Sequence, residues 1–151
     1  MPQSLAKILV HVIFSTKNRE PFPGTDALRR EVNSYLAGVL RNCDSPAILA
    51  GSTTDHVHIL CSLSKNRALC DVIEEIKKSS SRWLKTKGPS LRGFHWQSGY
   101  GAFSVSQSNA QSVQDYIADQ DRHHQRLTFQ DEFRRFLKKY RVPFDERYVW
   151  D

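Results

Sequence analysis

The chain has 151 residues, of which 39% are hydrophobic, and 22 basic against 16 acidic side chains give a net charge of +6. This length suits one domain, 1–151, with a single core, and the composition is typical of a soluble globular protein. No apolar run approaches the roughly 20 residues of a membrane span, and no signal-peptide cleavage site is evident, so we expect a cytoplasmic protein without a membrane partner. Three cysteines without CxxC spacing do not indicate disulfides or a zinc ribbon.

Strand and helix patterns alternate in the first half of the chain. Residues 5–15 are rich in β-branched side chains and apolar on both faces, which predicts a central strand covered on both sides. Apolar residues at helical spacing predict a helix over 25–42. Two further strands are expected at 47–53 and 55–63, joined by a brief turn into a hairpin.

The second half adds one strand and three helices. A helix is predicted over 67–86 and a strand that begins in glycine over 99–106. The pattern SNAQ at 108–111 is typical of a capping box and predicts a helix over 109–125. A last helix is predicted over 129–140, with phenylalanines on its apolar face.

This order, β-α-β-β-α-β followed by two helices, predicts an α+β fold of the ferredoxin-like (RRM-like) type, a split β-α-β antiparallel sheet with additional C-terminal helices. In this arrangement the first two helices cover one face of the sheet. The other face is left for a ligand, a partner or the added helices.

A histidine pair, His56 and His58, stands out in the segment TDHVHILCSL. Side chains two residues apart in a strand point the same way, so the pair shares the face opposite to Val57, Ile59 and Cys61. Two imidazoles on one side of a sheet are a good start to a divalent metal site, although His-x-His pairs also occur by chance and a hydrogen-bonded histidine on a sheet is common. Asp55 is expected to serve as a turn residue.

A second group of polar residues falls on the predicted helix 109–125. Tyr116 and Gln120 are four residues apart and therefore share one helix face. Gln120 can offer a neutral oxygen to a hard cation, and Tyr116 can act as an oxygen nucleophile beside it. An amphipathic helix with an ordinary half-buried tyrosine is the alternative.

Basic side chains are concentrated in residues 65–92, which hold eight lysines and arginines against three acidic residues. Such a cluster predicts a phosphate-binding surface, or else a solvated helix face and a basic loop. The candidate DNA contacts are Lys77, Lys78, Arg82, Lys85 and Arg92. Trp96 and Tyr100 are candidates for base stacking, core or interface.

The segments DHVHIL and YIADQ together resemble the single-tyrosine HUH transposases of the IS-two-hundred group and the related REP-associated tyrosine transposases. HUH denotes His, a bulky apolar residue and His, here His56, Val57 and His58. VIFSTKNREPF, IKKSSSRWLK and WQSGYGAFSVSQS also look like family segments, in family order. Thr54 departs from the proline of many relatives, at a turn.

The resemblance implies a function and a set of roles. Tyr116 would be the nucleophile, and His56, His58 and Gln120 would bind a divalent metal, Mg²⁺ or Mn²⁺. The enzyme would cleave and rejoin single-stranded DNA at insertion-sequence ends through a 5′-phosphotyrosine, without a nucleotide cofactor. The implied partners are single-stranded or hairpin DNA and a second copy in a homodimer, in a prokaryotic cytoplasm and on the nucleoid when bound. His123 and His124 are expected to contact DNA or to pack.

Other functions stay open beside this one. A domesticated HUH nickase would retain the chemistry without mobility. A non-catalytic single-stranded nucleic-acid-binding module would use the sheet alone, although no strand has the aromatic alternation of RNA-binding sheets. A metal-dependent phosphodiesterase would use water in place of Tyr116.

Overall fold

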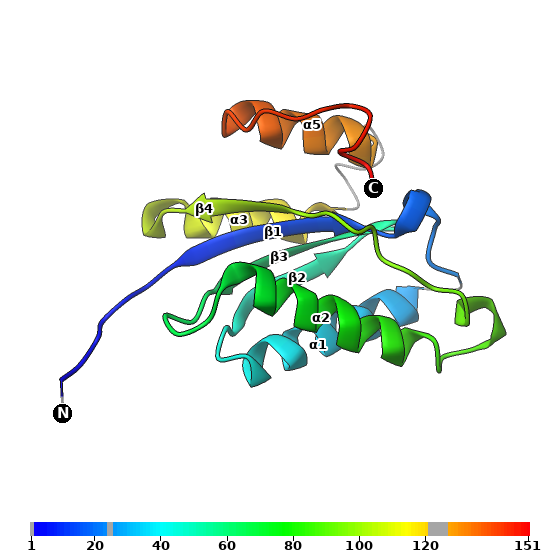
Figure 1. Ribbon diagram of the computed structural model, residues 1–151, viewed down its shortest axis with the longest axis horizontal. Helices are drawn as coiled ribbons and strands as arrows, with labels where there is room; N and C mark the ends of the chain where they lie inside the picture. Colours follow the sequence, from blue (N-terminus) through cyan, green and yellow to red (C-terminus); the bar gives the residue numbers. More distant parts are fainter. Residues whose placement is uncertain (1, 24–25, 121–126) are drawn as a thin grey trace.

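The computed structural model describes residues 2–23, 26–120 and 127–151. Four strands form one antiparallel sheet in the order β2-β3-β1-β4, and its helices lie on both faces (Figure 1). The strands are β1 (Leu9–Ser15), β2 (Ala47–Ser52), β3 (His56–Ser62) and β4 (Gly101–Val105). The helices are α1 (Asp26–Asn42), α2 (Leu69–Leu84), α3 (Ala110–Ala118) and α5 (Phe129–Lys139). The fold is the predicted α+β arrangement.

The main hydrophobic core lies between the sheet and the pair α1 and α2. Alternate residues of the two central strands face these helices, as a period of two requires. They pack against Val32, Leu36, Ile73 and Ile76, among others. The strand residues are Val10, Val12 and Phe14 of β1 and Val57, Ile59 and Cys61 of β3. The predicted core face of β3 is thereby confirmed.

The second face of the sheet is covered by α3 and α5. Leu9 and Leu60 pack against Ile117 of α3, and Ile13 packs in a cluster with Phe129 and Phe133 of α5. β1 is buried along its whole length, which confirms the prediction of a central strand covered on both sides. This face therefore receives the added helices.

Two glycines let these helices approach the sheet closely. A Cβ at Gly51 would lie 2.8 Å from the Ile117 side chain, and one at Gly101 would lie 2.4 Å from the Phe133 ring. A larger residue at either position would force Ile117 of α3 or Phe133 of α5 to shift. The glycine at the start of β4 is thus required by the packing of α5.

The C-terminal segment holds α5 in place from its outer side. Val149 and Trp150 join the cluster around Phe129 and Phe133, and the guanidinium of Arg134 lies 4.9 Å from the Trp150 ring. Figure 1 shows this segment returning along α5. At the start of the helix, Thr128 Oγ1 accepts a hydrogen bond from the Asp131 amide at 3.2 Å, as expected for an N-cap.

Predicted and observed elements differ mainly at their ends. β1 begins at Leu9 because β3 and β4 pair with β1 only from that residue onward. The predicted capping box at 108–111 is wrong: a 3₁₀ turn (Gln107–Asn109) precedes α3, and the Ser108 hydroxyl lies 3.0 Å from the hydroxyl of Ser106. α3 ends at Ala118, short of the predicted end at 125, and residues 121–126 lie outside the described part.

None of the helices in the described ranges is long and apolar enough to cross a membrane.

Candidate metal and tyrosine site

The two histidines of β3 meet a carboxylate from α5. His56 and His58 lie on the sheet face that α3 and α5 cover, and both are fully buried. Glu132 Oε1 lies 3.1 Å from His56 Nε2 and 2.8 Å from His58 Nε2. Ligand atoms of these three buried residues all fall within 4.8 Å of one another. Two imidazoles and a carboxylate are a donor set that divalent cations accept.

Hydrogen bonds on the far side of each ring orient the pair. His56 Nδ1 lies 2.8 Å from Thr53 Oγ1 and 2.7 Å from Asp55 Oδ1. His58 Nδ1 lies 2.9 Å from Nε2 of His11, which comes from the neighbouring strand β1. Both rings therefore present Nε2 to Glu132, and such outer contacts fix the orientation of metal-binding histidines. Asp55, predicted as a turn residue, thus also contacts the site.

Burial sets the charge of these imidazoles. It lowers the pKa of His11 to about 3, with the neighbouring His58 as the next cause, so His11 is neutral at neutral pH. Burial also acts to lower the pKa of His56. Hydrogen bonds to the carboxylates of Asp55 and Glu132 outweigh that effect and raise the pKa of His56 above its ordinary value.

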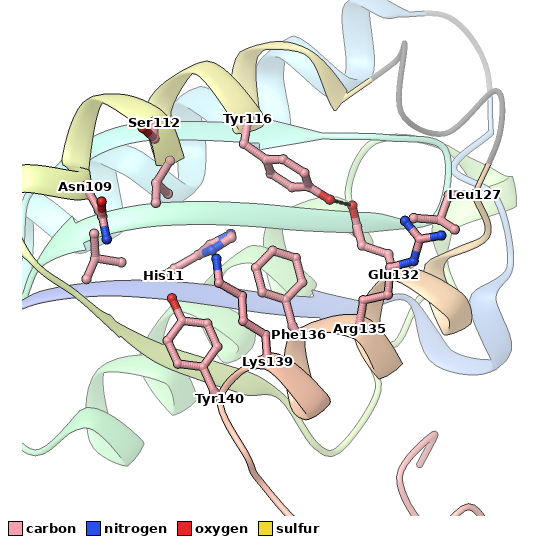
Figure 2. A pocket seen from close by; sticks show the side chains of 12 residues that line it. His11, Asn109, Ser112, Tyr116, Leu127, Glu132, Arg135, Phe136, Lys139 and Tyr140 are labelled. Carbon is pink, nitrogen blue, oxygen red and sulfur yellow. Dashed lines mark hydrogen bonds between the residues drawn. The ribbon is translucent and has the colours of Figure 1, made fainter.

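Tyr116 of α3 points at the same carboxylate. Its hydroxyl donates a hydrogen bond to Glu132 Oε2, drawn as the dashed line in Figure 2. The Tyr116 ring centroid lies 5.8 Å from that of His58. Burial, followed by the charge of Glu132 and its hydrogen bond, raises the pKa of Tyr116, so the phenol is protonated at neutral pH. Within one chain, Glu132 thus bridges the tyrosine and the histidine pair.

Gln120 lies one helical turn beyond Tyr116 and is 3% exposed. Its side-chain amide donates to the Tyr116 carbonyl at 3.1 Å, and a hydrogen bond from Gln120 also opposes the rise in the pKa of Tyr116. The residue is therefore next to the tyrosine, as predicted. Its role as a metal ligand stays a prediction.

Sequence reasoning missed Glu132 and the contact of His11. Glu132 lies in FQDEFRRFLKK, three residues after Phe129 and four before Phe136, on the apolar stripe of the helix. An acidic residue in that position must be buried when the helix docks, and Glu132 is 1% exposed. A buried carboxylate requires a partner, so its place in the stripe was the available signal.

The basic residues of the α2 region lie on the other side of the sheet. Lys77 donates to the carbonyl oxygens of Gln97, Ser98 and Gly99 at 2.8, 3.2 and 2.6 Å, and burial lowers its pKa to about 8. Lys78, Arg82 and Arg92 are exposed and Lys85 is partly buried. Trp96 is a core residue, whereas Tyr100 is 39% exposed. His123 and His124 fall outside the described residues.

A cavity of about 470 Å³ opens beside the tyrosine, between α3 and α5. Figure 2 shows Tyr116 and Glu132 toward one end and Asn109 toward the other. Its wall on the α5 side carries Arg135, Phe136, Lys139 and Tyr140, and its wall on the α3 side carries Asn109 and Ser112. The site is therefore accessible from the tyrosine side, although its histidines are buried.

Comparisons with known proteins agree on one family. The model of IS200-like transposases matches residues 4–120. The ISDra2 transposase TnpA of Deinococcus radiodurans is 29% identical in an alignment of 119 positions, and the match covers 73% of this chain and 81% of that protein. Two solved structures share the fold at lower sequence identity, one of a transposase candidate from Deinococcus radiodurans R1 and one of a REP-associated tyrosine transposase bound to a REP hairpin.

The first of these structures has a TM-score of 0.61 at 21% identity, and the alignment covers 80% of this chain and 95% of the other. The second has a TM-score of 0.58 at 15% identity, and the alignment covers 82% of this chain and 73% of the other. The family match spans the whole sheet, the histidine pair and the tyrosine helix. This chain belongs to the family of IS200-like transposases.

Proposed function

We propose that the protein cleaves and rejoins single-stranded DNA at insertion-sequence ends by metal-assisted transesterification, with Tyr116 as the nucleophile and a 5′-phosphotyrosine as the intermediate. One observation carries the proposal: the Tyr116 hydroxyl donates to the carboxylate whose other oxygen faces both His56 and His58. Membership of the transposase family supports it. A structural neighbour that was solved bound to a REP hairpin supports a nucleic-acid hairpin, and with it DNA, as the substrate.

The residues present fit a divalent cation. Adjacent corners of an octahedron with bonds of ~2.1 Å lie ~3.0 Å apart. The distances from Glu132 Oε1 to the two Nε2 atoms, 3.1 and 2.8 Å, are close to this value. His56, His58 and Glu132 would hold the cation, with Gln120 as the further ligand that the family resemblance implies. Mg²⁺ or Mn²⁺ would polarise the scissile phosphate and stabilise charge in the transition state.

The chain itself supplies the nucleophile and an acceptor for its proton. The Tyr116 oxygen forms a bond to phosphorus, while the bond from phosphorus to the 3′ oxygen breaks. Glu132 Oε2, which already accepts the hydrogen bond of Tyr116, is the atom placed to receive the phenol proton. The departing oxygen takes up a proton and leaves as a 3′-hydroxyl. Attack by another 3′-hydroxyl on the tyrosyl linkage reverses the step and rejoins the strand.

The geometry bears on assembly and on DNA contacts. Because Tyr116 reaches Glu132 of its own chain, a site built within one chain is sterically possible, while the expected homodimer remains a prediction. DNA contacts by Lys77, Lys78, Arg82, Lys85 and Arg92 also remain a prediction. α2 covers the face opposite to Tyr116, so these residues would bind DNA away from the scissile phosphate.

The test is a denaturing gel of protein incubated with labelled single strands from the DNA that flanks its gene, with Mg²⁺ or Mn²⁺. Wild-type protein should form a covalent adduct that EDTA prevents. Tyr116→Phe should form none, whereas the matched control Tyr148→Phe should match wild type, because Tyr148 is 65% exposed and lies in the C-terminal segment.

Two results would overturn the proposal. An adduct that persists in Tyr116→Phe would assign the nucleophile elsewhere. Strand cleavage without adduct, retained in Tyr116→Phe and lost in His58→Ala, would select the phosphodiesterase that uses water.

A further inference from the structure

The cavity between α3 and α5 has features that the cleavage chemistry does not use. Its volume of about 470 Å³ lies within the range of small-ligand sites. It extends from Tyr116 and Glu132 to Asn109, where β4 leads into α3. A space of this size beside the nucleophile can hold one nucleotide.

Two cationic side chains of α5 line this cavity. Arg135 and Lys139 are one turn apart on α5, and both side chains are exposed. Neither forms an ion pair with a residue in the described ranges, whereas the adjacent Arg134 pairs with Asp131 at 3.0 Å and Glu146 at 2.6 Å. Cationic side chains that line a cavity favour an anionic ligand, and guanidinium groups bind phosphate in bidentate fashion.

Two aromatic rings line the cavity beside the cations, that of Phe136 on α5 and that of Tyr140 just after the helix. The Phe136 ring meets the Tyr116 ring edge to face at 5.6 Å. The Tyr140 ring stacks on Phe103 of β4 at 4.7 Å, which holds it rigidly. Such rings are the usual platforms for unpaired bases.

The opposite wall of the cavity carries Ser112 of α3 and Asn109, the residue just before α3. Both are exposed, and their polar groups can form hydrogen bonds with the edge of a base.

We infer that this cavity binds the unpaired nucleotide next to the phosphate that Tyr116 attacks. Arg135 and Lys139 bind its backbone phosphates, Phe136 and Tyr140 provide the stacking surface, and Asn109 faces the base edge. The inference rests on the proposed function, because it takes the ligand to be the DNA strand that Tyr116 cleaves. It also assigns DNA contacts to α5, a helix that begins beyond the residues matched by the family model.

The first experiment measures binding without chemistry. Fluorescence anisotropy in EDTA compares wild type with Arg135→Ala/Lys139→Ala on a labelled single strand from the flanking DNA, over a range of salt concentrations. We expect at least a 10-fold loss of affinity, and a slope of log K against log salt that is smaller by about 1.4, since each phosphate contact on a single strand contributes about 0.7. Lys7→Ala/Lys138→Ala removes the same charge from exposed positions away from the cavity.

The control variant Lys7→Ala/Lys138→Ala should lose less than 3-fold in affinity. Its slope of log K against log salt should equal that of wild type. Equal losses and equal slopes in the two double variants would overturn the inference. Thermal unfolding of each variant verifies the fold, because all four substituted side chains are exposed.

The second experiment tests the base. Strands with an abasic residue on either side of the scissile phosphate should bind wild type more weakly on one side only, by about 10-fold, the range of one base stacked on an aromatic ring. Phe136→Leu/Tyr140→Leu should abolish this discrimination. If wild type bound the intact strand and both abasic strands equally, the inference would fail, while adduct formation by Tyr116 would still stand. Conversely, the binding results can hold even if no adduct forms.

Discussion

The two faces of the sheet are built from the same strands and differ in the polar side chains that they bury. Toward α1 and α2, β1 and β3 present only hydrocarbon side chains and a thiol. Toward α3 and α5, the same strands present His11, His56 and His58 among their apolar residues, and α5 adds Glu132. One face is a conventional core, whereas the other is a buried polar network within a hydrophobic frame.

The polar face is stable because its buried groups satisfy one another. Each ring nitrogen of His56 and His58 has a partner within 3.1 Å. An unpaired polar group buried in the same place would cost about 1–3 kcal/mol. The comparison teaches that alternate residues of one strand can serve two purposes: those on one face stabilise the core, and those on the other form the polar site. The following predictions test whether the two are separate.

The largest effect is expected from neighbouring substitutions in β3. His58→Ala should lower metal affinity and adduct formation by more than about 100-fold, a greater loss than that caused by outer contacts of a metal site. Ile59→Ala, one residue on and facing α1 and α2, should instead cost about 2–5 kcal/mol of stability. Adduct yield per folded molecule and the free energy of unfolding in urea measure the two effects. If Ile59→Ala abolished the adduct in folded protein, the two faces would not be separate.

Glu132→Gln should lower metal affinity by at least about 10-fold, because losing a charged ligand should cost no less than losing an outer contact of a metal site. The change keeps the size of the side chain and removes its charge. Because the charge of Glu132 is one of the causes that raise the pKa of Tyr116, the variant should also titrate this phenol at lower pH than wild type does. Isothermal calorimetry with Mn²⁺ and ultraviolet titration measure both, with Glu74→Gln on the exposed side of α2 as the control. Equal metal affinity in the two variants would remove Glu132 from the ligand set.

His11 should make stability depend on pH. Its folded pKa of about 3 lies below the unfolded value of 6.5, so its stabilising contribution is complete above pH 6.5. As pH falls from 6.5 toward 3 that contribution is lost, by at most about 1.4 kcal/mol per pH unit. The raised pKa of His56 changes stability with pH in the opposite direction. The carboxylates of the protein also contribute to the dependence of stability on pH.

The difference between wild type and His11→Leu therefore isolates the contribution of His11. Urea unfolding at pH 7 and pH 5 should show a smaller loss of stability on acidification in the variant. An equal loss in the two proteins would show that His11 takes up its proton as easily in the folded chain as in the unfolded one.

The last effect is expected on the face of the sheet that α1 and α2 cover, at Lys77 of α2. Lys77→Met should lower stability by about 1–3 kcal/mol, because three backbone carbonyls lose a charged donor. Thermal unfolding measures it, and Lys78→Met is the exposed neighbour for comparison. Equal stability of the two variants would mean that the contacts of Lys77 are replaced by water at no cost.

Much of this fold could be predicted because its signals are local. Alternation identified β3 and the opposite faces of His58 and Ile59, and helical spacing identified α2 and α5. Element ends were less accurate, since the end of a strand depends on where its neighbours stop pairing. The prediction of a capping box at 108–111 was wrong because Ser108 lies inside a 3₁₀ turn and not at the start of α3.

The sequence by itself determined the strand that carries His56 and His58, their common face, and the helix that carries Tyr116. Only the tertiary structure decided that Glu132 completes the group, that His11 orients His58, and that the tyrosine reaches the pair within one chain. The reason is physical. The periods of a strand and a helix are local and readable, whereas a contact between residues 58 and 132 depends on how α5 docks on the sheet.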